Sequence, residues 1–489
     1  MSSFQRKITK GVLWSAIDVL LRQGSQFVIL IVMARILSPE DFGVMALLGL
    51  FIGLANVFVD GGFSSALIQR QNITRVDEST VFFFNLGMGL FVCLALCAAA
   101  PYIAFLFDKP ILRPLTYALA INVFISAFGA IHITLLTREL DFKLIAKVSG
   151  VSSILAGVAG ILLAVNGFGI WSLASQTLTA TLLSTILLWA WHSWRPLWTF
   201  NFGSLRSFFR FGGYLLLTGI VDTLHINLYS ILIGKFYHTR EVGFYDRAQK
   251  TQLLPVNFIM QIINRVAFAA FSAVAEDKER LASAFRKAQR LVMFVNIPLS
   301  VTMMILAEPI VITLFGEKWL PSAPILQVLG VVGLIWPMHV LNINVLQAQG
   351  RSDLFFNIML IKKTVAISLT VAGSFHGIMG LAWAQVAASA FALLVNAYFS
   401  KVFLNLGAIR QVLDLLPSFA AAVPMGAAMW LVNQGPYSAD YVGLAIGLLT
   451  GGILYLLLTY LFKAEALREL SGMLPLHRIQ NLTPDRGQR

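Results

Sequence analysis

Charged residues are scarce in this sequence: they make up 12% of its 489 residues, against about 25% in ordinary soluble domains. Hydrophobic residues make up 58%. So little polar surface cannot cover so much apolar bulk in water, which excludes a soluble protein of several domains. In lipid every backbone amide must be bonded internally, so the chain must cross the membrane as helices or as a closed barrel. The apolar runs are about 20 residues long and do not alternate between polar and apolar residues, which predicts helices.

Cysteine is almost absent as well. Cys93 and Cys97, four residues apart in one apolar run, are the only two in the sequence, which excludes a disulfide framework and a cysteine metal site. The sequence also lacks a phosphate-binding loop and a nucleophile elbow, so ATP hydrolysis and zinc chemistry have no support. We therefore expect no cofactor, no metal and no enzymatic activity.

The basic residues indicate how the chain is oriented. The formal net charge is +13, but these residues lie in short loops between apolar runs, which is typical of a membrane protein and not of a nucleic acid-binding module. Counting lysines and arginines gives 24 on one side of the predicted layout and 6 on the other. This bias predicts that both termini lie in the cytoplasm and that the number of spans is even.

Fourteen apolar runs are long enough to span a bilayer. They lie near residues 11–36, 42–67, 79–105, 114–136, 146–165, 169–191, 209–236, 242–274, 288–314, 320–348, 355–375, 378–400, 414–433 and 440–462.

The two halves of this layout resemble each other. A shift of 200 residues pairs Ile31 with Ile231, Arg35 with Lys235, Asp41 with Glu241 and Gly43 with Gly243. Six spans per repeat leave both copies in the same orientation, which predicts two bundles around a central cavity. The expected fold is an all-α membrane protein with six-helix lobes at 1–200 and 201–405, two further spans within 406–462 and a cytoplasmic tail at 463–489.

Several motifs occur together at matching places along the chain. They are ARILSPEDFG at 34–43, DGG at 60–62 followed by ALIQR at 66–70, VGFYDRA at 242–248, FGEKW at 315–319 and PILQ at 324–327. Jointly they resemble Wzx-type polysaccharide flippases, most closely the colanic acid and teichuronic acid exporter branch. The resemblance implies the fold of the multidrug, oligosaccharidyl-lipid and polysaccharide exporters. It also implies an undecaprenyl-pyrophosphate-linked oligosaccharide as cargo, moved by alternating access during exopolysaccharide or lipopolysaccharide assembly in the bacterial inner membrane.

Ionisable residues inside spans are costly to insert and usually face a partner or a wet cavity. Six basic and four acidic residues fall there, so the interior favours an anionic cargo such as a pyrophosphate. The candidate substrate contacts are Arg22, Arg247, Lys250, Arg265 and Lys362. For Lys362 and its neighbour Lys363 the alternative is that the side chains reach the inner interface.

The acidic residues are candidates for coupling or gating. Asp18 and Arg22 share a helix face near the midplane, and the shift of 200 pairs Arg22 with Asp222, which suggests a latch between the lobes. Asp18 and Arg22 could instead only neutralise each other for insertion. His225, three residues after Asp222, could share a proton or cation with it, and Asp60 falls near the inner end of its span.

The sequence leaves two other functions open. A cation-coupled multidrug exporter would have the same fold, although the basic interior disfavours cationic cargo. A membrane polymerase or ligase acting on lipid-linked glycans would need an ordered site outside the hydrocarbon, and the predicted outer loops have only about 5 to 12 residues. The expected partners are the lipid-linked oligosaccharide, membrane lipid and a coupling ion, H⁺ or Na⁺, and a monomer is expected.

Overall fold

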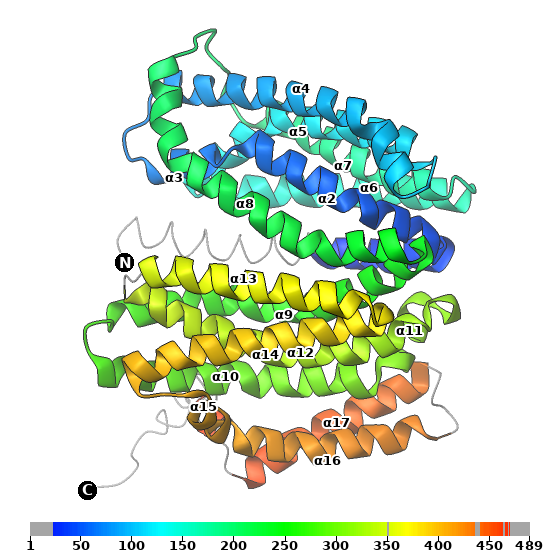
Figure 1. Cartoon of the computed structure of the whole chain (residues 1–489), viewed down its shortest axis with the longest axis vertical. Helices are drawn as coiled ribbons and strands as arrows, with labels where there is room; N and C mark the ends of the chain where they lie inside the picture. The colour runs from blue at the N-terminus through cyan, green and yellow to red at the C-terminus, as the bar shows by residue number, and fades with distance from the viewer. Residues whose placement is uncertain (1–22, 350–351, 436–440, 463–464, 468, 470–489) are drawn as a thin grey trace, which may run out of the picture. The chain divides into compact units, whose positions relative to one another are not determined.

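The computed structural model describes residues 23–349, 352–435, 441–462, 465–467 and 469, and most of them are helical (Figure 1). Eleven helices of this described part are long and apolar enough to cross a membrane, which agrees with an all-α membrane protein. The predicted number of fourteen is not confirmed by this count. The first predicted span is described only from Gln23, as the apolar helix Gln23–Ile36.

Contacts between helices divide the chain into two units, one up to Asp246 and one from Arg247 onwards. The first contains Gln23–Ile36, α2 (Pro39–Asp60), α3 (Phe63–Gln69), α4 (Arg75–Leu106), α5 (Leu112–Glu139), α6 (Phe142–Val165), α7 (Ile170–Trp191), α8 (Phe202–Phe236) and the beginning of α9 (Thr239–Ala273). In this unit α8 packs against α2. The lobe boundary at residue 200, suggested by the sequence repeat, stays a prediction.

The second unit contains the rest of α9 and the helices that follow it. These are α10 (Lys278–Ile305), α11 (Ala307–Phe315), the short 3₁₀ helix η1 (Glu317–Trp319), α12 (Ser322–Ala348), α13 (Ser352–Ser374), α14 (Gly377–Leu404), α15 (Ala408–Asp414), α16 (Leu416–Asn433) and α17 (Tyr441–Leu461).

The SPED sequence of the first motif starts helix α2. Ser38 is the N-cap and Pro39 the first helical residue, where a missing amide proton costs nothing. The Asp41 backbone amide donates to Ser38 Oγ at 3.2 Å, and the Ser38 amide donates to Asp41 Oδ2 at 2.9 Å. This reciprocal capping box satisfies two amides that have no partner within the helix, and Thr74 and Asp77 build the same box at the start of α4.

The DGG motif interrupts the span predicted at 42–67. Gly61 and Gly62 have positive φ angles of 56° and 74°, and they separate α2 from α3. A Cβ atom at Gly62 would lie 2.5 Å from the carbonyl oxygen of Gly212, and one at Gly212 would lie 2.8 Å from the carbonyl oxygen of Gly61. The single predicted helix is therefore two helices, because α8 approaches the turn so closely that only glycine fits on both sides.

Helix α10 begins earlier than the span predicted at 288–314. It starts at Lys278, where Asp277 Oδ1 accepts hydrogen bonds from the amides of Glu279 and Arg280. Its first turns are polar, so they extend the helix beyond its apolar part. Helix α10 ends at Ile305, and α11 begins after Leu306.

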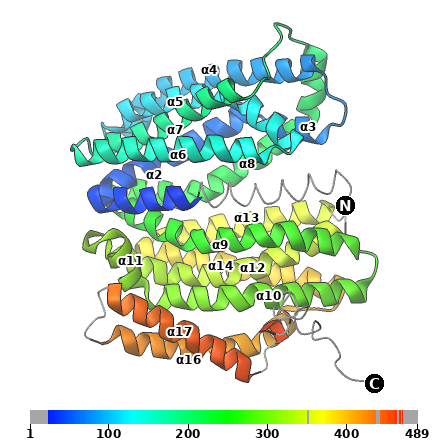
Figure 2. The same ribbon diagram turned by 180° about the vertical axis from the view of Figure 1, so that it is seen from behind.

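The last two helices pack within the second unit. Figure 2 shows α16 and α17 beside α10, and buried Met293, Met425 and Met429 belong to one apolar cluster there. Tyr455 Oη of α17 donates to the Phe294 carbonyl of α10 at 3.0 Å. These bonds and contacts attach the two helices outside the sequence repeat to the unit that precedes them.

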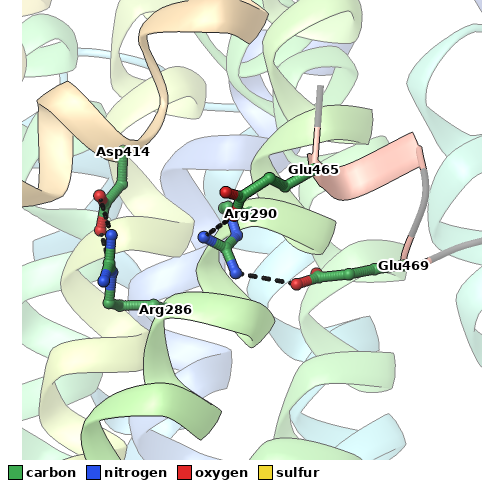
Figure 3. Close-up of polar contacts among 5 residues, drawn as sticks. All are labelled: Arg286, Arg290, Asp414, Glu465 and Glu469. Carbon is green, nitrogen blue, oxygen red and sulfur yellow. Dashed lines mark hydrogen bonds and ion pairs between the residues drawn. The ribbon is translucent and has the colours of Figure 1, made fainter. Parts of the chain in front are cut away.

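Three acidic residues contact the polar first turns of α10 (Figure 3). Arg286 donates to both carboxylate oxygens of Asp414, at 2.6 and 2.5 Å. Arg290 donates to Glu469 at 2.8 Å and also pairs with Glu465. Arg286 and Asp414 form a bidentate pair, which is the strong geometry for a guanidinium and a carboxylate.

Breaking that pair should destabilise the second unit. Because the Asp414 side chain is only 11% exposed, Asp414→Asn is expected to lower the free energy of unfolding by about 1–2 kcal/mol, as for other charged hydrogen bonds. The measurement is thermal unfolding of the purified full chain in detergent. Arg280→Gln is the control, since its pair with Asp277 is mostly exposed and should contribute at most about 0.5 kcal/mol. Equal losses in the two variants would contradict the prediction.

Candidate functional site

The candidate residues divide between described and undescribed parts of the chain. Asp18 and Arg22 lie outside the described residues, and Arg265 lies in α9 but its side chain is not among those described. Of the others, three lie in the first unit and three in the second. The first set is Asp60, Asp222 and His225, and the second is Arg247, Lys250 and Lys362.

Lys362 lies ten residues into the 23-residue helix α13, about 15 Å from its start by helical rise. Its Nζ donates to Asn396 Oδ1 of α14 at 3.0 Å. Asn396 is fully buried and donates in turn to the His339 carbonyl of α12 at 3.0 Å. The lysine is therefore bonded to a buried amide of the neighbouring helix near the middle of α13, and its role as a substrate contact stays a prediction.

Arg247 packs against aromatic rings. Its side chain is fully buried, and its guanidinium carbon lies 5.3 Å from the ring centre of Phe315 and 5.0 Å from that of Trp319. A cation over an aromatic face is favourable, most of all where water is excluded. The two aromatic residues come from the FGEKW motif, so this motif and Arg247 from VGFYDRA form one packing unit.

The remaining candidates are less closely defined. Lys250 is exposed on α9, and Asp60 is half-buried at the end of α2. Asp222 and His225 are both half-buried and lie three residues apart on α8. A role for this pair in coupling or gating stays a prediction.

The two glycines paired by the sequence repeat lie against each other. A Cβ atom at Gly43 would overlap the carbonyl oxygen of Thr239, and one at Gly243 would overlap that of Pro39. Thr239 follows Pro39 by 200 residues, as Gly243 follows Gly43. The starts of α2 and α9 therefore cross in a reciprocal contact with local two-fold character, and only residues without a side chain allow it.

A cavity lined by hydroxyl groups lies within the first unit, and the sequence did not point to it. It has a volume of about 470 Å³ and is formed by α5, α6, α7 and Gln26. Its polar lining consists of Gln26, Ser126, Ser149, Ser152, Ser153, Thr181, Ser184 and Thr185. Ser152 Oγ is buried and has no hydrogen-bond partner among the described residues. Hydroxyls and an amide cannot neutralise a phosphate, but they can exchange hydrogen bonds with sugar hydroxyls.

A pair of histidines was also missed, since they lie 60 residues apart in sequence. His132 Nδ1 and His192 Nδ1 are 2.9 Å apart, and the His132 ring packs against Trp189 and Trp194. Burial lowers the pKa of His192, which lies just beyond α7. A neutral pair fits this geometry, with one ring nitrogen donating to the other.

Tryptophans near the end of α7 are of the residue type that anchors membrane proteins at the interface. Trp198 is exposed, as an interfacial anchor would be. Trp194 is buried and donates to Glu78 at 2.6 Å, and Trp189 donates to the Phe128 carbonyl at 3.0 Å. These two tryptophans therefore pack and bond within the first unit.

Two groups of solved structures share this fold. A lipid II flippase MurJ in an inward closed conformation superposes with a TM-score of 0.76 over 93% of this chain and all of that chain, at 16% identity. An inward-facing multidrug resistance transporter of the MATE family, from the MOP superfamily, gives 0.64 over 81% of this chain and 98% of that chain, at 18% identity. The class of protein is thus defined by its fold, that of a multi-pass membrane protein built like these transporters.

The family follows from the sequence comparison. The chain belongs to the family described as "Polysaccharide biosynthesis protein", whose model matches residues 32–324. The resemblance to polysaccharide flippases drawn from the motifs is confirmed.

Three relatives span most of this chain. The lipopolysaccharide biosynthesis protein WzxC of Escherichia coli is 28% identical and covers 78% of each chain. The teichuronic acid biosynthesis protein TuaB of Bacillus subtilis is 26% identical, over 94% of this chain and 96% of its own. The succinoglycan biosynthesis transport protein ExoT of Rhizobium meliloti is 25% identical over 96% of each.

Proposed function

We propose that this chain is a flippase that moves an undecaprenyl-pyrophosphate-linked oligosaccharide from the cytoplasmic to the outer leaflet. The observation that carries the proposal is membership of the polysaccharide biosynthesis family in a chain with a transporter fold. The named relatives act in the biosynthesis or transport of lipopolysaccharide, teichuronic acid and succinoglycan. The sugar units of these products differ, so the shared part of the cargo would be its lipid-linked phosphate.

Two features of the described residues support such a cargo. Lys362 places a positive charge near the middle of α13 with a neutral amide as its hydrogen-bond partner, which leaves its charge available to an anion. The hydroxyl-lined cavity offers hydrogen bonds without charge, as a sugar requires. In our proposal Lys362 contacts the pyrophosphate.

The crossing of α2 and α9 supports alternating access. In alternating access, two helix surfaces separate and rejoin in each transport cycle. Such surfaces can pack closely, but their side chains should not interdigitate. The reciprocal glycine contact has this property, because backbone atoms meet directly and no rotamers must rearrange. In our proposal it closes the outer end of the pathway and opens when the cargo leaves.

The finer features of the proposal follow from the charge distribution and the family. The protein would be a monomer of the bacterial inner membrane with both termini in the cytoplasm, without enzymatic activity of its own. A proton or sodium gradient, or consumption of the product, would supply the driving force. Arg22, Arg247, Lys250 and Arg265 would join Lys362 along the path of the cargo.

Arg22→Ala tests the function directly. Arg22 is the basic residue predicted closest to the midplane, so its loss is expected to abolish export while the protein stays inserted at normal abundance. Lipid-linked repeat units should accumulate on the cytoplasmic leaflet, which extraction and sugar analysis of the lipid fraction would detect. Arg22→Lys should restore export only in part, because lysine keeps the charge but loses the planar, bidentate guanidinium.

Asp18→Asn is the control for insertion. If Arg22→Ala exports normally while Asp18→Asn fails, Arg22 is a counter-ion and the anion-binding role is wrong. If the chain confers resistance to cationic dyes and its deletion leaves surface polysaccharide unchanged, the protein is a multidrug exporter and the proposed function is wrong.

A further inference from the structure

A basic pocket in the second unit lies apart from the residues assigned to the cargo. It has a volume of about 670 Å³, within the roughly 300–1,000 Å³ typical of ligand sites. Its charged lining consists of Lys278, Glu279, Arg286, Arg290 and Arg410. Four basic side chains and one acidic side chain thus face a single cavity between α10 and the segment that joins α14 to α15.

Two of these cations already pair with acidic residues. Arg286 bonds Asp414, and Arg290 pairs with Glu465 and Glu469 (Figure 3). Lys278 and Arg410 have no ion pair within the part of the chain that the structure describes, and both are exposed. These two are therefore the cations that the pocket offers to a ligand.

The wall that carries Arg410 is held in place by buried amides. Gln411 Nε2 donates to Asn342 Oδ1 at 2.8 Å, and Asn342 Nδ2 donates to Gln411 Oε1 at 3.0 Å. Gln411 also donates to the Leu406 carbonyl at 3.0 Å. This buried, reciprocal bonding fixes α15 against α12, so Arg410 projects from a rigid support.

Apolar side chains next to the pocket are exposed. Ile409, Val412 and Leu413 of α15, Leu416 at the start of α16 and Val402 at the end of α14 all present large apolar surface. In a membrane protein such a surface faces lipid, and cations beside it lie where head groups begin. A ligand that fits both features carries a phosphate at one end and hydrocarbon at the other.

We propose that this pocket binds the phosphate head group of an anionic membrane phospholipid, with Lys278 and Arg410 as its main contacts. Arg286 and Arg290 add positive potential from the pocket wall. The bound lipid would connect α10 with α14 and α15 at the membrane surface. Its acyl chains would lie along the exposed apolar residues of α15.

The test uses the full chain purified in a neutral detergent. Binding of dioctanoyl phosphatidylglycerol is measured by thermophoresis and compared with dioctanoyl phosphatidylcholine, which has the same chains but no net charge. We expect a clear preference for phosphatidylglycerol. Lys278→Gln and Arg410→Gln should each weaken its binding about 5-fold, and the double variant about 30-fold, from about 1 kcal/mol per basic residue near a lipid surface.

The matched control removes the same charge from the same region. Lys287 on α10 and Lys401 on α14 are exposed and do not line the pocket, so Lys287→Gln with Lys401→Gln should change binding less than about 2-fold if the pocket is specific. An equal loss of phosphatidylglycerol binding in the control variant would show non-specific electrostatic attraction and overturn the proposal. Equal binding of the two lipids to the unmodified chain would also overturn it.

Two further ligands separate the possible sources of phosphate. Inorganic phosphate that binds as tightly as phosphatidylglycerol would show a simple anion site and overturn the lipid assignment. Farnesyl pyrophosphate that displaces phosphatidylglycerol and binds more tightly, with export lost in the double variant, would make the pocket part of the cargo path instead. The expected result is that neither competes and that the double variant still exports, which keeps this inference separate from the proposed function.

Discussion

Gly43→Ala is expected to lose at least about 10-fold in export, because a methyl group there overlaps the Thr239 carbonyl oxygen and such overpacking costs about 1–3 kcal/mol. A backbone carbonyl cannot rotate away as a side chain can. The two helices must therefore separate, which favours the conformation in which they are apart. Gly243→Ala should have the same effect, since its methyl group meets the Pro39 carbonyl oxygen.

The reciprocal contact also predicts how the two substitutions combine. Once one methyl group has separated the helices, a second costs little more, so the double variant should be about as impaired as either single variant. Export is measured by complementation. Separation of the helices is measured by the rate at which an impermeant maleimide labels a cysteine placed at Glu241.

Gly87→Ala is the matched control, because a Cβ atom there would have no neighbour within 4 Å. It should export and label like the unmodified chain. Strictly additive losses at Gly43 and Gly243, or normal export in both, would show that the crossing is only a packing contact.

Lys362→Met is expected to lose export by about 10-fold or more, since it removes the positive charge in α13 that is proposed to meet the pyrophosphate. The protein should still insert, because methionine fills similar space without a buried charge. Lys362→Arg should keep part of the activity. Export is measured with the same complementation assay, and membrane abundance is measured alongside.

Asn396→Ala distinguishes a functional charge from a structural bond. It removes the partner of the 3.0 Å hydrogen bond to Lys362 but keeps the lysine, so it should retain most of the export. Lys363→Met controls for loss of charge at the neighbouring position. If Asn396→Ala and Lys362→Met fail alike and both are poorly inserted, Lys362 holds helices together and does not bind cargo.

The sequence by itself determined the class of this protein. Scarce charge, long apolar runs and basic loops leave a helical membrane protein as the only arrangement that satisfies the backbone in lipid. The motifs identified the family, and the shift of 200 residues singled out Gly43 and Gly243. Their pairing in sequence did not show that the two glycines touch, because a repeat gives equivalent places and not contacts.

Only the tertiary structure decided which side chains meet. Lys362 bonds Asn396, Arg247 packs against Phe315 and Trp319, and Gly61 and Gly62 end a helix that hydropathy alone would continue. In a soluble protein the polar face of each helix would have indicated its rotation. In a membrane protein the lipid-facing and the protein-facing sides are both apolar, so the rotation of each helix, and with it every contact between helices, is set by packing of small residues and a few polar bonds.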